Sequence, residues 1–210
     1  MTGTTVHLVR HGEVDNPQHV LYGRLPGYHL SAAGRRMSER VAKVLVDHDV
    51  TYLVSSPLER AQETAEPIGA ALGLPIHLDD RLIEAGNAFA GHSFGPGDRA
   101  LLHPRYWPLL RNPFRPSWGE PYRAIAQRML AAVADARAAA EGHEAVCVSH
   151  QLPIWVLRRY VEGGRLWHSP RNRQCALASL TSLTFDGERV VQVRYAEPAG
   201  PQPAGGTRGA

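Results

Sequence analysis

The sequence contains few of the residues that extracellular scaffolds and membrane proteins need. Its 210 residues include only two cysteines, Cys147 and Cys175, and each lies inside an apolar run. This usage favours buried free thiols in a reducing cytoplasm over a disulfide. No window approaches the roughly 20 apolar residues of a membrane span, and the first residues lack the pattern of a signal peptide. We therefore expect a cytoplasmic protein with no membrane partner.

Lysine is also scarce: Lys43 is the only one, so arginine supplies nearly all of the positive charge. The net charge is +3 and the isoelectric point is near 9.1, which suits an anionic substrate. No basic run is interleaved with aromatic residues, which argues against a nucleic-acid partner. The abundance of Ala, Gly, Pro and Arg is typical of a GC-rich bacterial genome. The sequence has no P-loop and no His and carboxylate cluster with zinc-like spacing, so we expect no cofactor and no metal.

Alternating strand and helix patterns predict an α/β fold, specifically a three-layer α/β/α sandwich with a mostly parallel central sheet. Ser31 is expected to cap a helix with Met37, Val41, Val44, Leu45 and His48 on one face. Ser56-Pro57-Leu58-Glu59 has the pattern of a capping box that opens a second helix, which Pro67 should end or kink. The expected strands cover residues 6–9, 51–54, 76–78, 145–148, 175–185 and 189–195, the last two joined at Asp186-Gly187, and further helices cover residues 121–140 and 154–161.

We expect a single domain over residues 1–197. Residues 86–119 are rich in Gly, Pro, Arg and Trp and have little periodicity, which is unusual inside a compact domain. Two interpretations stay open for them: a positive, aromatic substrate cap, or a solvated loop packed by its tryptophans. Residues 198–210 are dominated by Pro, Gly and Ala and are expected to form a disordered tail.

The most informative local pattern is Arg10-His11-Gly12, which directly follows the first expected strand. An imidazole can act as a nucleophile near neutral pH, and a guanidinium binds phosphate oxygens in pairs. Glycine lets the backbone approach a ligand closely. This combination suits phosphate chemistry.

Three later segments place related residues at the same edge of the sheet. Arg60 lies in the first turn of the helix after the second strand, Glu84 follows Leu82-Ile83 near the end of the third, and His150 follows the strand at residues 145–148. Ligands of open parallel sheets bind at the carboxyl ends of the strands. We therefore expect these side chains to meet in one site. Asp79, Asp80 and Glu13 are alternatives to Glu84 as the acid.

The motifs are Leu8-Val9-Arg10-His11-Gly12-Glu13; Tyr22-Gly23 with Leu30-Ser31 and Gly34; Ser55-Ser56-Pro57-Leu58 with Arg60-Ala61 and Thr64-Ala65; Leu82-Ile83-Glu84; and Val148-Ser149-His150. As an ordered set over about residues 6 to 160, they resemble the histidine phosphatase superfamily, also called the phosphoglycerate mutase-like family.

The resemblance implies a role for each residue. His11 would attack phosphorus and form a phosphohistidine. Arg10, Arg60 and a protonated His150 would surround the phosphoryl oxygens and supply positive charge without a metal. Glu84 would protonate the leaving oxygen and later accept a proton from water. The resemblance also implies phosphate or substrate contacts at Asn16, Gly23 and Gln151.

Three positions depart from the family pattern. Pro17 occupies the place where many relatives carry a phosphate-binding asparagine, and Asn16 is the nearest substitute. Gln151 replaces a glycine that often follows the second histidine. The segment Phe89-Ala90-Gly91 only partly keeps the usual Trp-Glu-Gly ending.

The leading function is a metal-independent phosphatase, a phosphoric monoester hydrolase acting through phosphohistidine on a small-molecule phosphate ester. A cofactor-dependent phosphoglycerate mutase is the alternative within the family, although the middle of the chain is short for the mutase lid. A non-catalytic phospholigand-binding module is the alternative from another class. Dimers occur in the family, so a homodimer stays open.

Overall fold

The computed structural model describes residues 3–92 and 119–200. The strands are β1 (Thr4–Arg10), β2 (Val50–Ser55), β3 (His77–Leu78), β4 (Glu144–Ser149), β5 (Leu180–Asp186) and β6 (Arg189–Ala196). The helices are α1 (Ala32–Leu45), α2 (Glu59–Leu72), α3 (Tyr122–Ala139) and α4 (Gln151–Val161), with short 3-10 helices η1 (Asp80–Leu82) and η4 (Pro170–Asn172).

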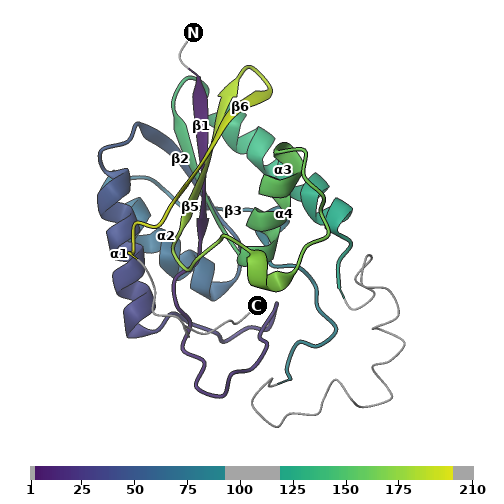
Figure 1. Ribbon diagram of the computed structural model, residues 1–210. Helices are drawn as coiled ribbons and strands as arrows, with labels where there is room; N and C mark the ends of the chain where they lie inside the picture. The colour runs from purple at the N-terminus through teal and green to yellow at the C-terminus, as the bar shows by residue number, and fades with distance from the viewer. Residues whose placement is uncertain (1–2, 93–118, 201–210) are drawn as a thin grey trace.

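The strands form one sheet in the order β3-β2-β4-β1-β5-β6. The strands from β3 to β1 run parallel, and β5 and β6 extend this sheet as an antiparallel hairpin. The predicted strands and their largely parallel arrangement are therefore confirmed. Figure 1 shows β1 beginning near the N-terminus at the top, so that the carboxyl ends of the parallel strands lie lower in that view.

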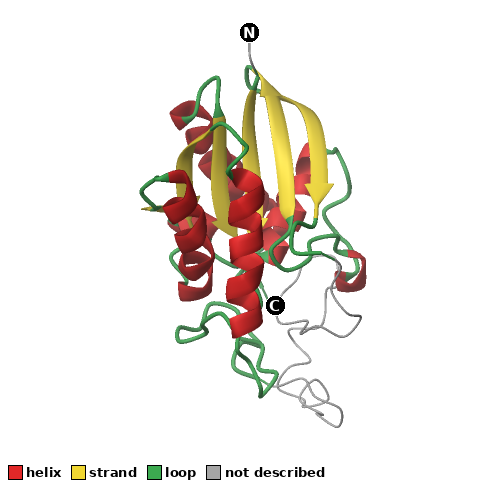
Figure 2. Cartoon of the chain, turned by 90° about the vertical axis from the view of Figure 1, so that its left-hand side faces the viewer, coloured by secondary structure: helices red, strands yellow, loops and turns green. Residues whose placement is uncertain are grey.

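Helices cover both faces of the sheet, which confirms the three-layer architecture (Figures 1 and 2). On one face, α1 and α2 pack through buried Val41, Leu45 and Ile68. On the other, α3 and α4 contribute residues such as Met129 and Leu157 to a second apolar core. Burial of aliphatic side chains from both helix layers holds the sheet rigid.

The first helix begins as predicted, because the Ser31 side chain accepts a hydrogen bond from the Gly34 N–H. The prediction for its apolar face is only partly right: Val41 and Leu45 are buried, but Val44 is 42% exposed. A helical stripe wider than the contact surface leaves its margin in solvent.

The predicted capping box at Ser56 is wrong. The second helix begins at Glu59, and its N-cap residue Leu58 provides no side-chain hydrogen bond. The Ser56 hydroxyl accepts a long hydrogen bond of 3.4 Å from the Leu58 N–H and pairs more closely with His150, at 2.8 Å. Pro67 was expected to end or kink this helix; it does not end it, since α2 continues through Pro67 to Leu72, and the kink stays a prediction.

Two further boundaries differ from the sequence prediction. The helix expected over residues 154–161 begins three residues earlier, at Gln151. The strand expected from Cys175 begins only at Leu180, because residues 175–179 form a loop in which Ala178 has φ 53°. In place of ladder hydrogen bonds, the Cys175 carbonyl accepts one from the Arg10 side chain.

Both cysteines are free and buried, as the sequence predicts. Within residues 3–92 and 119–200, no helix is long and apolar enough to cross a membrane. Most of the predicted cap, residues 93–118, lies outside the described residues, as do residues 201–210 of the predicted tail. Earlier in that tail, Ala199 is buried against the α1–α2 core, and its carbonyl accepts a hydrogen bond from Arg40.

Candidate active site

His11 lies directly after β1, at the carboxyl edge of the sheet, and is fully buried. Its backbone N–H donates to the Ser149 carbonyl and its own carbonyl accepts from Ala178, which fixes the residue between β4 and the loop before β5. The ring Nδ1 lies 2.8 Å from the Gly12 carbonyl. A carbonyl can only accept, so Nδ1 carries the proton and Nε2 has a free lone pair. Nε2 has no partner among the described residues and is available for nucleophilic attack.

The charge state of His11 matches this role. Burial, with Arg60 and Arg10 adding to it, holds the pKa of the imidazole well below its usual value, against the opposing hydrogen bond to Gly12. The unliganded ring is therefore neutral near pH 7. A neutral imidazole keeps the lone pair that attack on phosphorus requires.

Arg10 and Arg60 are two buried guanidiniums beside this ring. Arg10 donates through Nη1 to the Cys175 carbonyl at 2.7 Å, and Arg60 donates through Nη2 to the Gly23 carbonyl at 2.6 Å. Each of these bonds leaves other N–H groups unused: within residues 3–92 and 119–200, the buried Arg10 Nε, Arg60 Nε and Arg60 Nη1 find no partner. Buried donors that lack an acceptor indicate that an anion completes the site.

His150 lies at the start of α4, with its ring centroid 5.1 Å from that of His11. Its Nε2 pairs with the Ser56 hydroxyl at 2.8 Å, and its Nδ1 has no partner in the part of the chain that the structure describes. Burial, followed by Arg60 and His11, lowers the pKa of His150 well below its usual value. Burial among positive groups therefore favours the neutral ring of His150, and the protonated His150 expected from the family stays a prediction for the complex with phosphate.

Glu84 is a buried carboxyl group, 3% exposed. One oxygen accepts from the Ala85 N–H at 2.7 Å, and no described residue bonds to Oε2. Burial raises the pKa of Glu84, even though the Ala85 N–H and the nearby Arg60 act in the opposite direction. A carboxyl group with a raised pKa is suited to donate a proton. The Ser149 hydroxyl donates to the Leu82 carbonyl at 2.6 Å, which ties the chain just before Glu84 to the end of β4.

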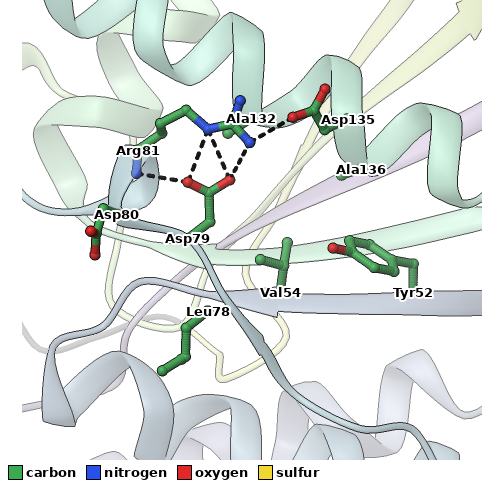
Figure 3. A pocket seen from close by; sticks show the side chains of 9 residues that line it. All are labelled: Tyr52, Val54, Leu78, Asp79, Asp80, Arg81, Ala132, Asp135 and Ala136. Carbon is green, nitrogen blue, oxygen red and sulfur yellow. Dashed lines mark hydrogen bonds and ion pairs between the residues drawn. The ribbon is translucent and has the colours of Figure 1, made fainter.

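The alternative acids lie elsewhere. Asp79 and Asp80 line a separate cleft of about 640 Å³ together with residues of β2 and α3 (Figure 3). Both Asp79 oxygens bond to Arg81, and these bonds outweigh burial and hold the pKa of Asp79 below its usual value. Glu13 accepts a hydrogen bond from the Ser31 hydroxyl at the start of α1. Glu84 is therefore the carboxyl group that the structure brings into the field of Arg10 and Arg60.

The three subsidiary contacts predicted from the family differ in their surroundings. Asn16 uses both ends of its amide on the Val20 backbone, at 2.9 and 3.0 Å. Gly23, with φ 44°, places its carbonyl on Arg60. Gln151 makes long hydrogen bonds of 3.4 Å to Cys175 and Arg173. These residues therefore contact neighbouring backbone and arginine groups of the site, and their contacts with phosphate stay predictions.

Backbone packing brings the nucleophile loop close to α1. A Cβ added at Gly12 would lie 2.6 Å from the Gly34 carbonyl oxygen, and one at Gly34 would lie 2.0 Å from that of Glu13. Real Cβ atoms do not approach oxygen so closely, so both positions require glycine. The Gly12 N–H also donates to the Thr64 hydroxyl on α2, which locks His11 relative to Arg60.

Three residues of the site were not predicted from the sequence. Ser56 was assigned to a helix cap, although it is the partner of His150. Tyr22 packs against the Arg60 guanidinium, whose Cζ lies 4.6 Å from the centroid of the tyrosine ring. Arg173 lies within the field of Glu84 and Arg10 and lines a small pocket with Glu84 and Gly23. Tyr22 and Ser56 belong to the motifs Tyr22-Gly23 and Ser55-Ser56-Pro57-Leu58, which could have indicated them. Arg173 lies in a segment without a recognisable sequence pattern.

Known proteins similar to this chain point to one family. A family model described as "Histidine phosphatase superfamily (branch 1)" matches residues 6–198. "Uncharacterized protein Rv0525" of Mycobacterium tuberculosis is 59% identical over 93% of this chain and 97% of its own length. "Uncharacterized phosphatase PhoE" of Bacillus subtilis is 30% identical over 77% of this chain and 79% of its own length. A solved structure of mycobacterial glucosyl-3-phosphoglycerate phosphatase Rv2419c has a TM-score of 0.72 and 26% identity, covering 92% of this chain and 96% of that one.

Proposed function

The chain belongs to the histidine phosphatase superfamily, whose model matches residues 6–198, and on that premise we propose that it hydrolyses phosphate monoesters through a phosphohistidine on His11. The observation that carries the proposal is the unpartnered Nε2 of a buried, neutral His11 among unused arginine donors. The arginines supply the positive charge that phosphoryl transfer needs. The proposed chemistry therefore requires no metal ion.

In the first step, the His11 Nε2 lone pair forms a bond to phosphorus while the bond from phosphorus to the ester oxygen breaks. Glu84 transfers its proton to that oxygen, so that the product leaves as a neutral alcohol. The free N–H groups of Arg10 and Arg60 bind the phosphoryl oxygens as charge develops on them. The unpartnered Nδ1 of His150 is a further group that can donate to an oxygen once a bound dianion raises its pKa.

In the second step, water attacks the phosphohistidine and the bond between phosphorus and Nε2 breaks. Glu84, now a carboxylate, accepts the proton from that water. The products are inorganic phosphate, neutral His11 and protonated Glu84, so the site returns to its starting state. Burial favours the protonated form of Glu84, which prepares it for the next cycle.

The charges around the pocket favour a substrate with a second anionic group. Arg10, Arg60 and Arg173 carry three positive charges, the two histidines are neutral, and Glu84 is protonated when it acts as the acid. A phosphate dianion neutralises two of these charges. Arg173 donates to His168 and Gln151, both neutral. We propose that Arg173 binds an additional carboxylate or phosphate of the substrate.

The test is hydrolysis of p-nitrophenyl phosphate between pH 5 and 8 with EDTA present, for the wild type and His11→Ala. Turnover that survives EDTA and vanishes in the variant supports the proposal, and equal turnover in both proteins contradicts it. Arg173→Gln then tests the substrate class. KM should rise for carboxylate-bearing phosphate esters and change little for p-nitrophenyl phosphate. An equal change for both substrates would remove the selective role of Arg173.

A further inference from the structure

A second cluster of polar side chains lies on the sheet, away from the His11 site. It joins His7 of β1, His48 of the loop between α1 and β2, and Glu144, the first residue of β4. Glu144 Oε2 lies 2.6 Å from His7 Nε2 and 2.8 Å from His48 Nδ1. The cluster is therefore near the amino ends of β2 and β4, whereas His11 follows the carboxyl end of β1.

These side chains have the right chemistry for a divalent transition metal. Two imidazoles and one carboxylate are a common ligand set for Zn²⁺, which leaves a fourth position for water. The three ligand atoms lie within 4.8 Å of one another. Other histidine and carboxylate contacts among the described residues, such as His143 with Asp49, do not bring a third such ligand into range.

The relation between the two rings supports the same conclusion. With Zn–N bonds of about 2.1 Å and tetrahedral angles, two imidazoles on one ion would have their ring centroids about 5 Å apart. The centroids of His7 and His48 are 5.1 Å apart, with the rings nearly perpendicular. The ring centroids therefore have the separation that a shared ion requires, and in the proposed site Glu144 moves back from its two hydrogen bonds to admit the ion.

His7 has a hydrogen-bond partner on its other ring nitrogen, and the cluster is open to solvent on one side. His7 is 3% exposed, and its Nδ1 lies 2.7 Å from the Ser182 hydroxyl on β5. Metal-binding histidines generally donate the N–H of their other ring nitrogen to a nearby acceptor, and the Ser182 oxygen is placed to accept from His7 Nδ1 once the proton moves there. The side chains of His48 and Glu144 are 37% and 25% exposed, so an ion can enter from that side.

Binding of an ion requires the imidazole proton of His7 and of His48 to move to the opposite ring nitrogen. When the cluster is empty, both imidazole N–H groups donate to the Glu144 carboxylate, which can only accept. When an ion binds, each ring releases that nitrogen to the ion and carries its proton on the opposite nitrogen. For His7 this nitrogen is Nδ1, which then donates to Ser182. With one proton on each of these two rings before and after, the ion binds without releasing a proton from the cluster.

We propose that His7, His48 and Glu144 form a binding site for a divalent transition-metal ion of the zinc type. The ion would fasten the loop before β2 to β1 and β4. This site would act on stability and not on phosphoryl transfer, because none of its residues belongs to the His11 site. The spacing of the three residues along the sequence is far from that of a zinc motif, and the sheet brings them together.

The test uses the full-length chain without an affinity tag, freed of metal by chelation. Zn²⁺ and Co²⁺ are titrated by calorimetry and by the visible absorption of bound Co²⁺, and the melting temperature is measured with and without Zn²⁺. The titrations are repeated in His48→Asn, Glu144→Gln and Ser182→Ala. The control variants are His143→Asn, a neighbouring surface histidine, and His11→Asn, which removes a histidine of the phosphatase site.

We expect one equivalent of Zn²⁺ to bind and to raise the melting temperature. His48→Asn and Glu144→Gln should abolish this binding, and Ser182→Ala should weaken it by about 10-fold. Both control variants should retain it. His48→Asn should leave hydrolysis of p-nitrophenyl phosphate unchanged. Absence of stoichiometric binding in the wild type overturns the proposal, as does binding that survives in Glu144→Gln or is lost in His11→Asn.

Discussion

The role of Glu84 as the proton donor makes a prediction that depends on the leaving group. In Glu84→Gln, the amide oxygen can keep the hydrogen bond from the Ala85 N–H, which is 2.7 Å long, so the buried loop should stay folded. The variant loses the transferable proton. General acid catalysis contributes about 100- to 10,000-fold, and an alkyl phosphate, whose leaving oxygen needs that proton, should lose this full factor in kcat.

A nitrophenyl phosphate should lose far less, because nitrophenolate leaves without protonation. The assay compares kcat for glycerol phosphate and p-nitrophenyl phosphate in the wild type and in Glu84→Gln. Asp80→Asn is the matched control, since Asp80 lies in the separate cleft of Figure 3 and its loss should affect neither substrate. Equal losses for the two substrates in Glu84→Gln would show that another group is the acid.

Three further predictions concern the same site. Arg60→Ala should raise KM and lower kcat together, because its guanidinium would bind ground and transition states; an unchanged kcat/KM would place it outside the site. Ser56→Ala should cost about 1 kcal/mol, about fivefold in kcat/KM, by removing the 2.8 Å contact with His150, with circular dichroism as the check on folding. Burial lowers the pKa of His11, so the nucleophile stays neutral and kcat/KM should persist below pH 6.5. Burial raises the pKa of Glu84, so kcat/KM should fall at higher pH as Glu84 loses its proton. This alkaline fall should vanish in Glu84→Gln.

Much of the fold could be predicted because its strands and helices have strong local patterns. The apolar runs at residues 6–9 and 145–148, and the hairpin at Asp186-Gly187, correspond to observed strands. The errors arose where a side chain serves a distant partner. Ser56 has the sequence pattern of a helix cap, but tertiary contact with His150 determines its role.

The central residues of the candidate site could be located because each follows a predictable strand or begins a helix. The order of strands in the sheet, with β4 between β2 and β1, then brings the segments that carry Arg60, His150 and His11 to neighbouring positions at one edge. Arg173 could not be located in this way. It lies in a loop after η4, and its position depends on contacts with His168 and Gln151 that have no local sequence signal. The cluster of His7, His48 and Glu144 is likewise assembled by strand pairing alone.

Trapping the covalent intermediate tests the central claim most directly. The enzyme is mixed with a labelled phosphate ester, quenched within the turnover time in base and in acid, and analysed by intact mass and peptide mapping. The account predicts one phosphoryl group on His11, stable in base and lost in acid, and none in His11→Ala. A phosphoryl group on another residue, or full turnover by His11→Ala with no labelled protein, would contradict it.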